Sequence, residues 1–131
     1  MAEVTYFERL DVPECLRLLG GGGVGRVVWQ GADGLTVLPV NYRLINGAVV
    51  FHTSPASPLA RLAEPTQVAF QVDEIDHGTA VGWSVLVRGT SGPSEVAGSV
   101  SFLAHNQPVS VAVNVEEVTG RVISGNPVPQ S

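Results

Sequence analysis

The chain contains no lysine, so all seven of its basic side chains are arginines, and twelve carboxylates give it a net charge of −5. An acidic chain of this kind is poorly suited to nucleic acid or an anionic membrane, because both require clustered positive charge. We therefore expect a small molecule as the ligand. Any phosphate group on that ligand must be held by arginine, hydroxyl or backbone N–H groups.

Cysteine is almost absent as well. The single Cys15 cannot form an internal disulfide, which fits a reducing compartment. No apolar run approaches the roughly 20 residues that cross a membrane, and the N-terminus lacks the basic and apolar segments of a signal peptide. We therefore expect a cytoplasmic protein.

Recognisable catalytic and metal-binding motifs are also missing. His77 and His105 have no partner at the spacing of a zinc site, so we expect no metal. No nucleophile motif occurs, so we assign no catalytic residue. The acidic group Asp73, Glu74 and Asp76 is typical of a solvated loop.

What the chain does have is apolar alternation interrupted by turn residues. We assign residues 1–124 to one domain and residues 125–131, with two prolines, to a flexible tail. The pattern predicts a mainly β fold, a small six-stranded antiparallel barrel, because sequential strands joined by tight turns must hide their edges. The predicted strands cover residues 24–30, 35–44, 48–53, 67–73, 79–91 and 108–122, with an Asn46-Gly47 hairpin turn.

Two short helices are expected in addition. Residues 10–19 read as a helix with Asp11 as its N-cap and Pro13 in its first turn, and residues 57–63 read as a second helix. Residues 94–103 fit either a short helix or coil. The glycine run 20–23 fits either a flexible connector or a phosphate loop, and the strand pattern after it favours the connector.

The turn between the third strand and the second helix has the residues of an anion site. Three hydroxyls, from Thr53, Ser54 and Ser57, lie next to a helix start whose N–H groups have no partner in the helix. The alternative is an ordinary helix cap, for which serine and threonine are common.

Several separate motifs resemble one family in their order and spacing. They are GRV at residues 25–27, VLPVNY at 37–42, VFHT at 50–53, SPL at 57–59, VAFQVDE at 68–74 and GWSVLVRG at 82–89. Together they are similar to the pyridoxamine 5′-phosphate oxidase-like superfamily, in the branch related to nitroimidazole reductases. The resemblance implies an FMN-binding split barrel, usually a homodimer with the flavin in a groove between two subunits.

The same resemblance implies which residues form the site. One strand would lie against the flavin ring, the following turn would face the phosphate, and a neighbouring strand would approach the ring. The residues carried over are Val37, Pro39, Val40 and Asn41 for the strand, His52, Thr53, Ser54 and Ser57 for the turn, and Trp83 and Ser84 for the neighbouring strand. Gly120-Arg121 matches a Gly-Arg that the family often has near its end.

The chain also departs from the family pattern. Relatives usually carry arginine or lysine just after the serine at 57, where this chain has Pro58 and Leu59. The nearest cation is Arg61, which would share a helix face with Ser57 at i, i+4. His52 is either a ligand contact or a strand-end histidine bonded to a carbonyl, and Trp83 is either a ring contact or interface filling.

Two functions follow from these observations. The resemblance implies an FMN-dependent oxidoreductase acting on a small planar electron acceptor, in which the cofactor performs the redox chemistry. The departures at Pro58 and Leu59 allow a non-catalytic relative that binds or senses a ligand, with weakened flavin phosphate binding. A deazaflavin is the alternative cofactor.

Overall fold

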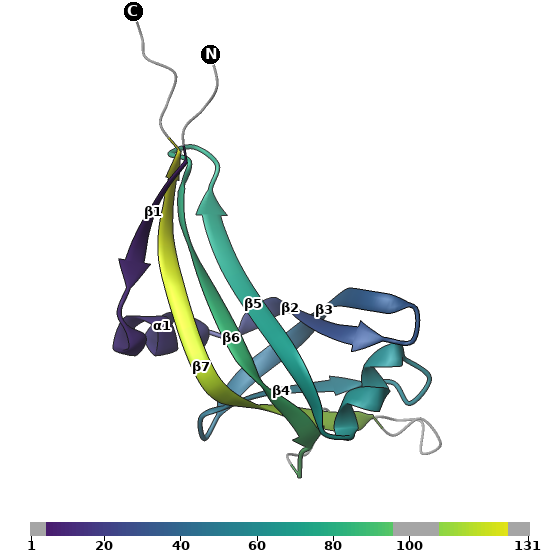
Figure 1. The fold of residues 1–131 in the computed structure, drawn as a ribbon. Helices are drawn as coiled ribbons and strands as arrows, with labels where there is room; N and C mark the ends of the chain where they lie inside the picture. Colours follow the sequence, from purple (N-terminus) through teal and green to yellow (C-terminus); the bar gives the residue numbers. More distant parts are fainter. Residues whose placement is uncertain (1–4, 96–107, 126–131) are drawn as a thin grey trace, which may run out of the picture.

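Alternating valines and short turns build most of the chain as antiparallel strands. The computed structural model describes residues 5–95 and 108–125. Its elements, shown in Figure 1, are β1 (Thr5–Leu10), α1 (Val12–Leu19), β2 (Gly23–Gly31), β3 (Gly34–Ile45), β4 (Ala48–Thr53), η1 (Pro58–Ala63), β5 (Thr66–Asp76), β6 (Val81–Pro93) and β7 (Val109–Gly125).

Two tight hairpins set the strand register. Asn46 and Gly47 have φ angles of 50° and 79°, the left-handed values that a type I′ turn requires, and they join β3 to β4. A second two-residue loop joins β2 to β3 between Gly31 and Gly34. The hairpin predicted at Asn46-Gly47 is confirmed.

Six of the strands form a closed antiparallel ring. The strand order β7-β4-β3-β2-β5-β6 is completed by pairing of β6 with β7, which confirms the predicted six-stranded barrel. The seventh strand, β1, was not predicted. It pairs with the far end of β7, from Thr5 opposite Gly125 to Leu10 opposite Gly120, so the first helix begins at Val12 rather than at residue 10.

The inner faces of the ring strands form the core. Its valines, including Val27, Val85, Val87 and Val111, are fully buried. Tyr42 and Phe70 meet edge to face with ring centroids 4.8 Å apart, a favoured aromatic geometry.

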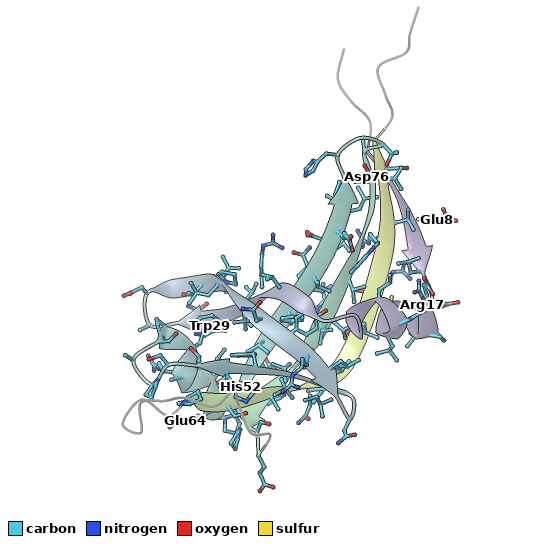
Figure 2. The ribbon with its side chains drawn as sticks, turned by 180° about the vertical axis from the view of Figure 1, so that it is seen from behind. Glu8, Arg17, Trp29, His52, Glu64 and Asp76 are labelled. Atoms are coloured by element: carbon cyan, nitrogen blue, oxygen red, sulfur yellow. The ribbon has the colours of Figure 1, made fainter. Side chains whose placement is uncertain are left out.

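The ends of β5, β6 and β7 continue beyond the barrel as a sheet that carries β1 at its edge (Figure 1). Figure 2 shows Asp76 at the far tip of this sheet and Trp29 and His52 on the barrel. The sheet therefore has two faces outside the closed ring, and α1 packs on one of them.

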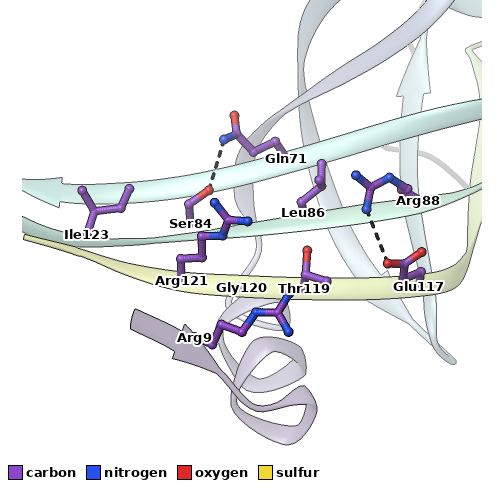
Figure 3. A pocket seen from close by; sticks show the side chains of 10 residues that line it. All are labelled: Arg9, Gln71, Ser84, Leu86, Arg88, Glu117, Thr119, Gly120, Arg121 and Ile123. Atoms are coloured by element: carbon purple, nitrogen blue, oxygen red, sulfur yellow. Dashed lines mark hydrogen bonds and ion pairs between the residues drawn. The ribbon is translucent and has the colours of Figure 1, made fainter. Parts of the chain in front are cut away.

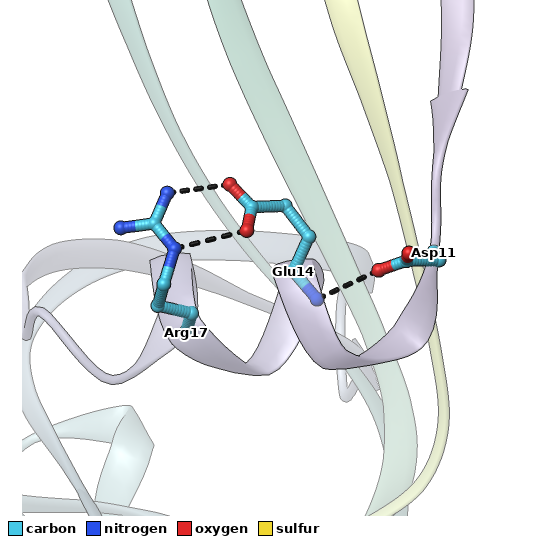
Figure 4. A network of polar contacts seen from close by, with 3 residues as sticks. All are labelled: Asp11, Glu14 and Arg17. Atoms are coloured by element: carbon cyan, nitrogen blue, oxygen red, sulfur yellow. Dashed lines mark hydrogen bonds and ion pairs between the residues drawn. The ribbon is translucent and has the colours of Figure 1, made fainter.

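The helix α1 is stabilised by a side-chain cap at its start and an ion pair along it (Figure 4). The Asp11 carboxylate accepts a 2.9 Å hydrogen bond from the Glu14 backbone N–H, and Glu14 forms an ion pair with Arg17. This confirms Asp11 as the N-cap. Cys15 is fully buried on the inner side of α1. Its sulfur lies so close to Gly120 of β7 that a Cβ at Gly120 would be 2.5 Å from it.

Other sequence predictions have mixed outcomes. The glycine run leads into β2 after positive φ angles at Gly22 and Gly23, so it does not open a helix. Most of the segment 94–103 and the tail from residue 126 lie outside the described residues, while Gly125 ends β7. Within the described parts of the chain, no helix has the length and apolar character needed to cross a membrane.

Candidate functional site

One edge of β3 has no strand partner in the described part of the chain. β3 pairs with β2 from Gly34 to Tyr42, and its pairing with β4 covers only Tyr42 to Ile45. Residues 35–41 therefore face β2 on one side and are open on the other. This open edge contains all four strand residues that the sequence predicted.

The hydrogen-bond alternation decides which backbone groups face outward. Gly31 and Gly34 flank a two-residue turn, so they exchange both of their backbone hydrogen bonds. Counting from that pair, the odd-numbered residues of β3 direct their N–H and C=O groups away from β2. Pro39, which has no N–H to donate, lies at such a position, so the ladder loses no bond there.

Val37 and Pro39 therefore offer backbone groups at the open edge, whereas Asn41 lies where the pairing with β4 begins and Val40 faces β2. The main chain of Val40 is paired with Gly25 and its side chain is only 7% exposed in the core. The side chains of Leu35 and Val37 are 79% and 54% exposed beside the edge. An apolar surface thus adjoins a row of main-chain donors and acceptors.

The turn after β4 begins next to this edge. The last pair of residues in the β3–β4 ladder is Tyr42 with Phe51, so Asn41 and His52 are the next residues in the same register. His52 Nε2 and Ser110 Oγ share a 3.1 Å hydrogen bond, which ties His52 to β7. The structure therefore brings the predicted strand and the predicted turn together.

Both serines of the turn serve the local backbone. Ser54 Oγ accepts a 3.2 Å hydrogen bond from the Ala56 N–H, and Ser57 Oγ accepts a 3.1 Å bond from the Leu59 N–H. Ser57 is the N-cap of η1, which agrees with the ordinary helix cap that the sequence analysis gave as the alternative to an anion site. Each hydroxyl proton can still be donated to a ligand.

The second helix is a 3₁₀-helix, not an α-helix, and this changes the position of Arg61. In a 3₁₀-helix, side chains three residues apart are eclipsed, so the fourth residue turns away. Arg61 lines a cleft of 220 Å³ with Trp29 and Glu64 on another side of the turn. The α-helical spacing behind the Arg61 prediction is wrong, and its contact with a ligand stays a prediction.

Trp83 and Ser84 point to opposite faces of β6, as adjacent strand residues do. Ser84 lines a hollow on the outer face of the sheet. Trp83 lines two clefts of 600 and 400 Å³ on the face that carries α1, and Leu18 lines both of them too. One chain therefore does not present both side chains to one ligand.

The hollow beside Ser84 contains residues that the sequence analysis did not identify (Figure 3). It measures 460 Å³ and lies over β1, β5, β6 and β7. Its polar lining includes Arg9, Gln71, Ser84, Arg88, Glu117, Thr119 and Arg121. Alternation along β7 is the only local signal, because it places Thr119 and Arg121 on one face.

Among the described residues, no group of three or more histidine, cysteine or acidic side chains could hold a metal ion. The predicted residues that the fold brings together supply main-chain groups, hydroxyls and apolar surface. Such groups bind and orient an organic ligand with an anionic part.

A family model, a relative and several solved structures match most of this chain. The family description "Pyridoxamine 5′-phosphate oxidase" matches residues 11–122. An uncharacterized protein of Mycobacterium tuberculosis, Rv0080, is 31% identical over 92% of this chain and 88% of its own length. The FAD binding protein from Mycobacterium smegmatis is 27% identical over 89% of this chain and 98% of its own, with a TM-score of 0.76.

A third likeness concerns the fold alone. A candidate 5-nitroimidazole antibiotic resistance protein from Bacteroides thetaiotaomicron has a TM-score of 0.73 at 15% identity, covering 95% of this chain and 93% of its own. These matches confirm the family resemblance and the split-barrel fold.

Proposed function

Because the chain belongs to the pyridoxamine 5′-phosphate oxidase family, we propose that it binds a flavin with the edge of the isoalloxazine ring along the open edge of β3. The observation that carries this proposal is the edge of β3 at Val37 and Pro39, which no other strand covers among the residues that the structure describes. The pyrimidine edge of a flavin alternates acceptors with an N–H donor. Along this edge Val37 offers an N–H donor and a C=O acceptor, and Pro39 adds a C=O acceptor alone.

The surrounding side chains suit the ring faces. Leu35 and Val37 supply exposed apolar surface beside the edge, and a planar aromatic ring gains from covering it. His52, Thr53, Ser54 and Ser57 would face the phosphate end of the cofactor, since this turn follows the open edge in the register. FMN and FAD share this part of the molecule, and a deazaflavin shares the same ring edge.

We further propose that the protein is an oxidoreductase acting on a small planar electron acceptor. A bound flavin supplies reversible two-electron chemistry. The residues of this chain bind the cofactor, orient it and cover one side of it. The absence of an assigned acid or base is compatible with this role, because the cofactor carries the reaction.

A homodimer would complete the groove. Within one chain, Ser84 is separated from β3 by β2 and β5 on the barrel surface. Val24, Leu35 and Val37 are each more than half exposed on the outer face of β2 and β3, which is typical of a surface that a partner covers. A second copy would bring its own sheet face over the open edge.

Flavin titration with two matched variants tests the proposal. Val37 and Val81 are both exposed strand valines, 54% and 45%, and Val81 lies at the tip of the sheet away from the barrel. A buried carboxylate beside the ring is costly, so Val37→Asp should weaken FMN and FAD binding by about tenfold or more, as measured by flavin fluorescence, whereas Val81→Asp should change it little.

Two results would count against the proposal. Absence of binding at ~100 µM flavin, an affinity weaker than about −5.5 kcal/mol, would reject the flavin itself. Equal losses in the two variants would reject the open edge as the ring site.

The alternative is a non-catalytic relative, favoured by one observation. Pro58 and Leu59 occupy the positions where relatives carry cations, so the cofactor phosphate would have no charge-assisted bond from them. In that case flavin would bind weakly or not at all, while the barrel and its dimer would persist.

A further inference from the structure

A cleft opens at the end of the barrel where β2 and β5 separate. The last pair of the β2–β5 ladder is Trp29 with Val68, but β2 continues to Gly31 and β5 begins at Thr66. The space between these strand ends is a cleft of 220 Å³, bounded by the β2–β3 turn and by η1, which are neighbours in Figure 1. Figure 2 shows Trp29 and Glu64, which both line it, at the end of the barrel away from Asp76.

The indole N–H of Trp29 is a donor without an acceptor in this cleft. Trp29 is only 6% exposed, and a buried indole N–H usually has a hydrogen-bond partner. Nε1 has none among the residues that the structure describes, although every side-chain nitrogen or oxygen there that is sealed from solvent has one. Nε1 is therefore open to the cleft, beside Gly31, where a Cβ would be 3.5 Å from it.

Two opposite charges share the same cleft. Arg61 lies in η1 and Glu64 is its C-cap, and both residues are exposed. Residues three apart in a 3₁₀-helix are eclipsed, so the two side chains leave η1 on one side. On α1 the pair with the same spacing, Glu14 and Arg17, forms an ion pair, whereas in the described parts of the chain Arg61 and Glu64 form none. Both charges are therefore available to a ligand.

We propose that this cleft binds a small zwitterion, a free amino acid with one carboxylate and one ammonium group. The Arg61 guanidinium offers paired N–H donors to the carboxylate, and the Trp29 indole N–H adds a third. The Glu64 carboxylate accepts from the ammonium group. An anion or a cation alone would leave one of the two protein charges without a partner.

The size and position of the cleft agree with this ligand. Its 220 Å³ is below the range of pockets for drug-sized molecules, so it suits a smaller one. Val37 and Pro39 of the open β3 edge do not line it. Amino-acid binding is therefore separate from the proposed flavin site and does not depend on it.

The indole N–H signals in the NMR spectrum of the nitrogen-labelled protein test the site. The chain has two tryptophans, and Trp83→Phe assigns their two signals. At least one of glycine, L-alanine and L-serine at ~10 mM should shift the Trp29 signal. The Trp83 signal should stay in place, because Trp83 lines clefts on the α1 side of the sheet.

Ligands with a single charge and three variants test the roles of the two side chains. Propionate and ethylamine, each with one charge of L-alanine, should bind at least tenfold more weakly than the tightest of the three amino acids. Arg61→Gln and Glu64→Gln should each lower amino-acid affinity by about tenfold or more. Both residues are exposed, so the variants should fold. Arg43→Gln, which removes an exposed arginine of β3 outside the cleft, is the matched control and should bind as the wild type does.

Four results would overturn the proposal. The first is an unmoved Trp29 signal with all three amino acids at ~10 mM. The second is binding of propionate or ethylamine as tight as that of the best amino acid. The third is an equal loss of affinity in Arg43→Gln. The fourth is a loss of FMN binding in Arg61→Gln, which would assign the cleft to the flavin phosphate.

Discussion

Gly25 of β2 is a glycine because Phe70 occupies the space where a side chain would lie. A Cβ at Gly25 would be 2.2 Å from the Phe70 ring, and the same ring is held by Tyr42. Gly25→Ala should therefore lower the free energy of unfolding by about 1 to 3 kcal/mol through overpacking. Gly92→Ala is the control, since none of the residues that the structure describes has an atom within 4 Å of its Cβ position, and denaturant unfolding should show little loss for it. Equal losses would contradict this packing.

Two buried groups predict how stability depends on pH. Burial raises the pKa of the Cys15 thiol, with the Asp11 and Glu14 carboxylates adding to the effect, and burial raises the pKa of Tyr42. The folded chain then holds these protons at a pH where the unfolded chain has released them. The free energy of unfolding should therefore fall above about pH 8.5, and further above about pH 10, the unfolded values.

Denaturant unfolding at a series of pH values measures this dependence. Cys15→Ala should be less stable overall because it leaves a cavity, but it should lose the decrease that begins near pH 8.5. A variant with the same slope as the wild type would show that another group titrates there.

Among the elements, η1 places Pro58 and Leu59, the two positions where relatives carry cations, in different environments. Pro58 is exposed at the start of the 3₁₀-helix, whereas Leu59 is 7% exposed in the core. Pro58→Lys should therefore fold normally and place a cation beside Ser57, tightening FMN binding by about tenfold through a charge-assisted bond. Leu59→Lys should destabilise the barrel instead. If Pro58→Lys leaves the FMN dissociation constant unchanged, missing charge is not what limits phosphate binding.

The elements also show which features a sequence can predict. A hairpin is specified by residues that are only a few positions apart in the chain, so the pairing of β3 with β4 could be predicted from Asn46-Gly47. The strand β1 was missed because it pairs with the far end of β7, more than a hundred residues away, as the pair Thr5 and Gly125 shows. The pairing of Arg9 with Arg121 was missed for the same reason, since only the folded register brings these two arginines together.

At the scale of the whole molecule, the outer face of β2 and β3 should hold two copies together. Light scattering at ~50 µM, where an obligate dimer is complete, should give twice the 13.7 kDa chain mass. Leu35→Lys should shift this mass toward the monomer, because Leu35 is 79% exposed on that face. Val12→Lys, on α1, should leave the dimer intact. A monomeric wild type would remove the second copy from the proposed groove.

The central claim is that this barrel binds a flavin at the open edge of β3. The most direct measurement is the absorbance spectrum of the protein incubated with FMN or FAD and then desalted. We expect flavin absorbance to remain with the protein for at least one of the two cofactors, and to be lost from the Val37→Asp variant. A colourless protein after incubation with either cofactor, with no quenching of flavin fluorescence at ~100 µM, would contradict the claim.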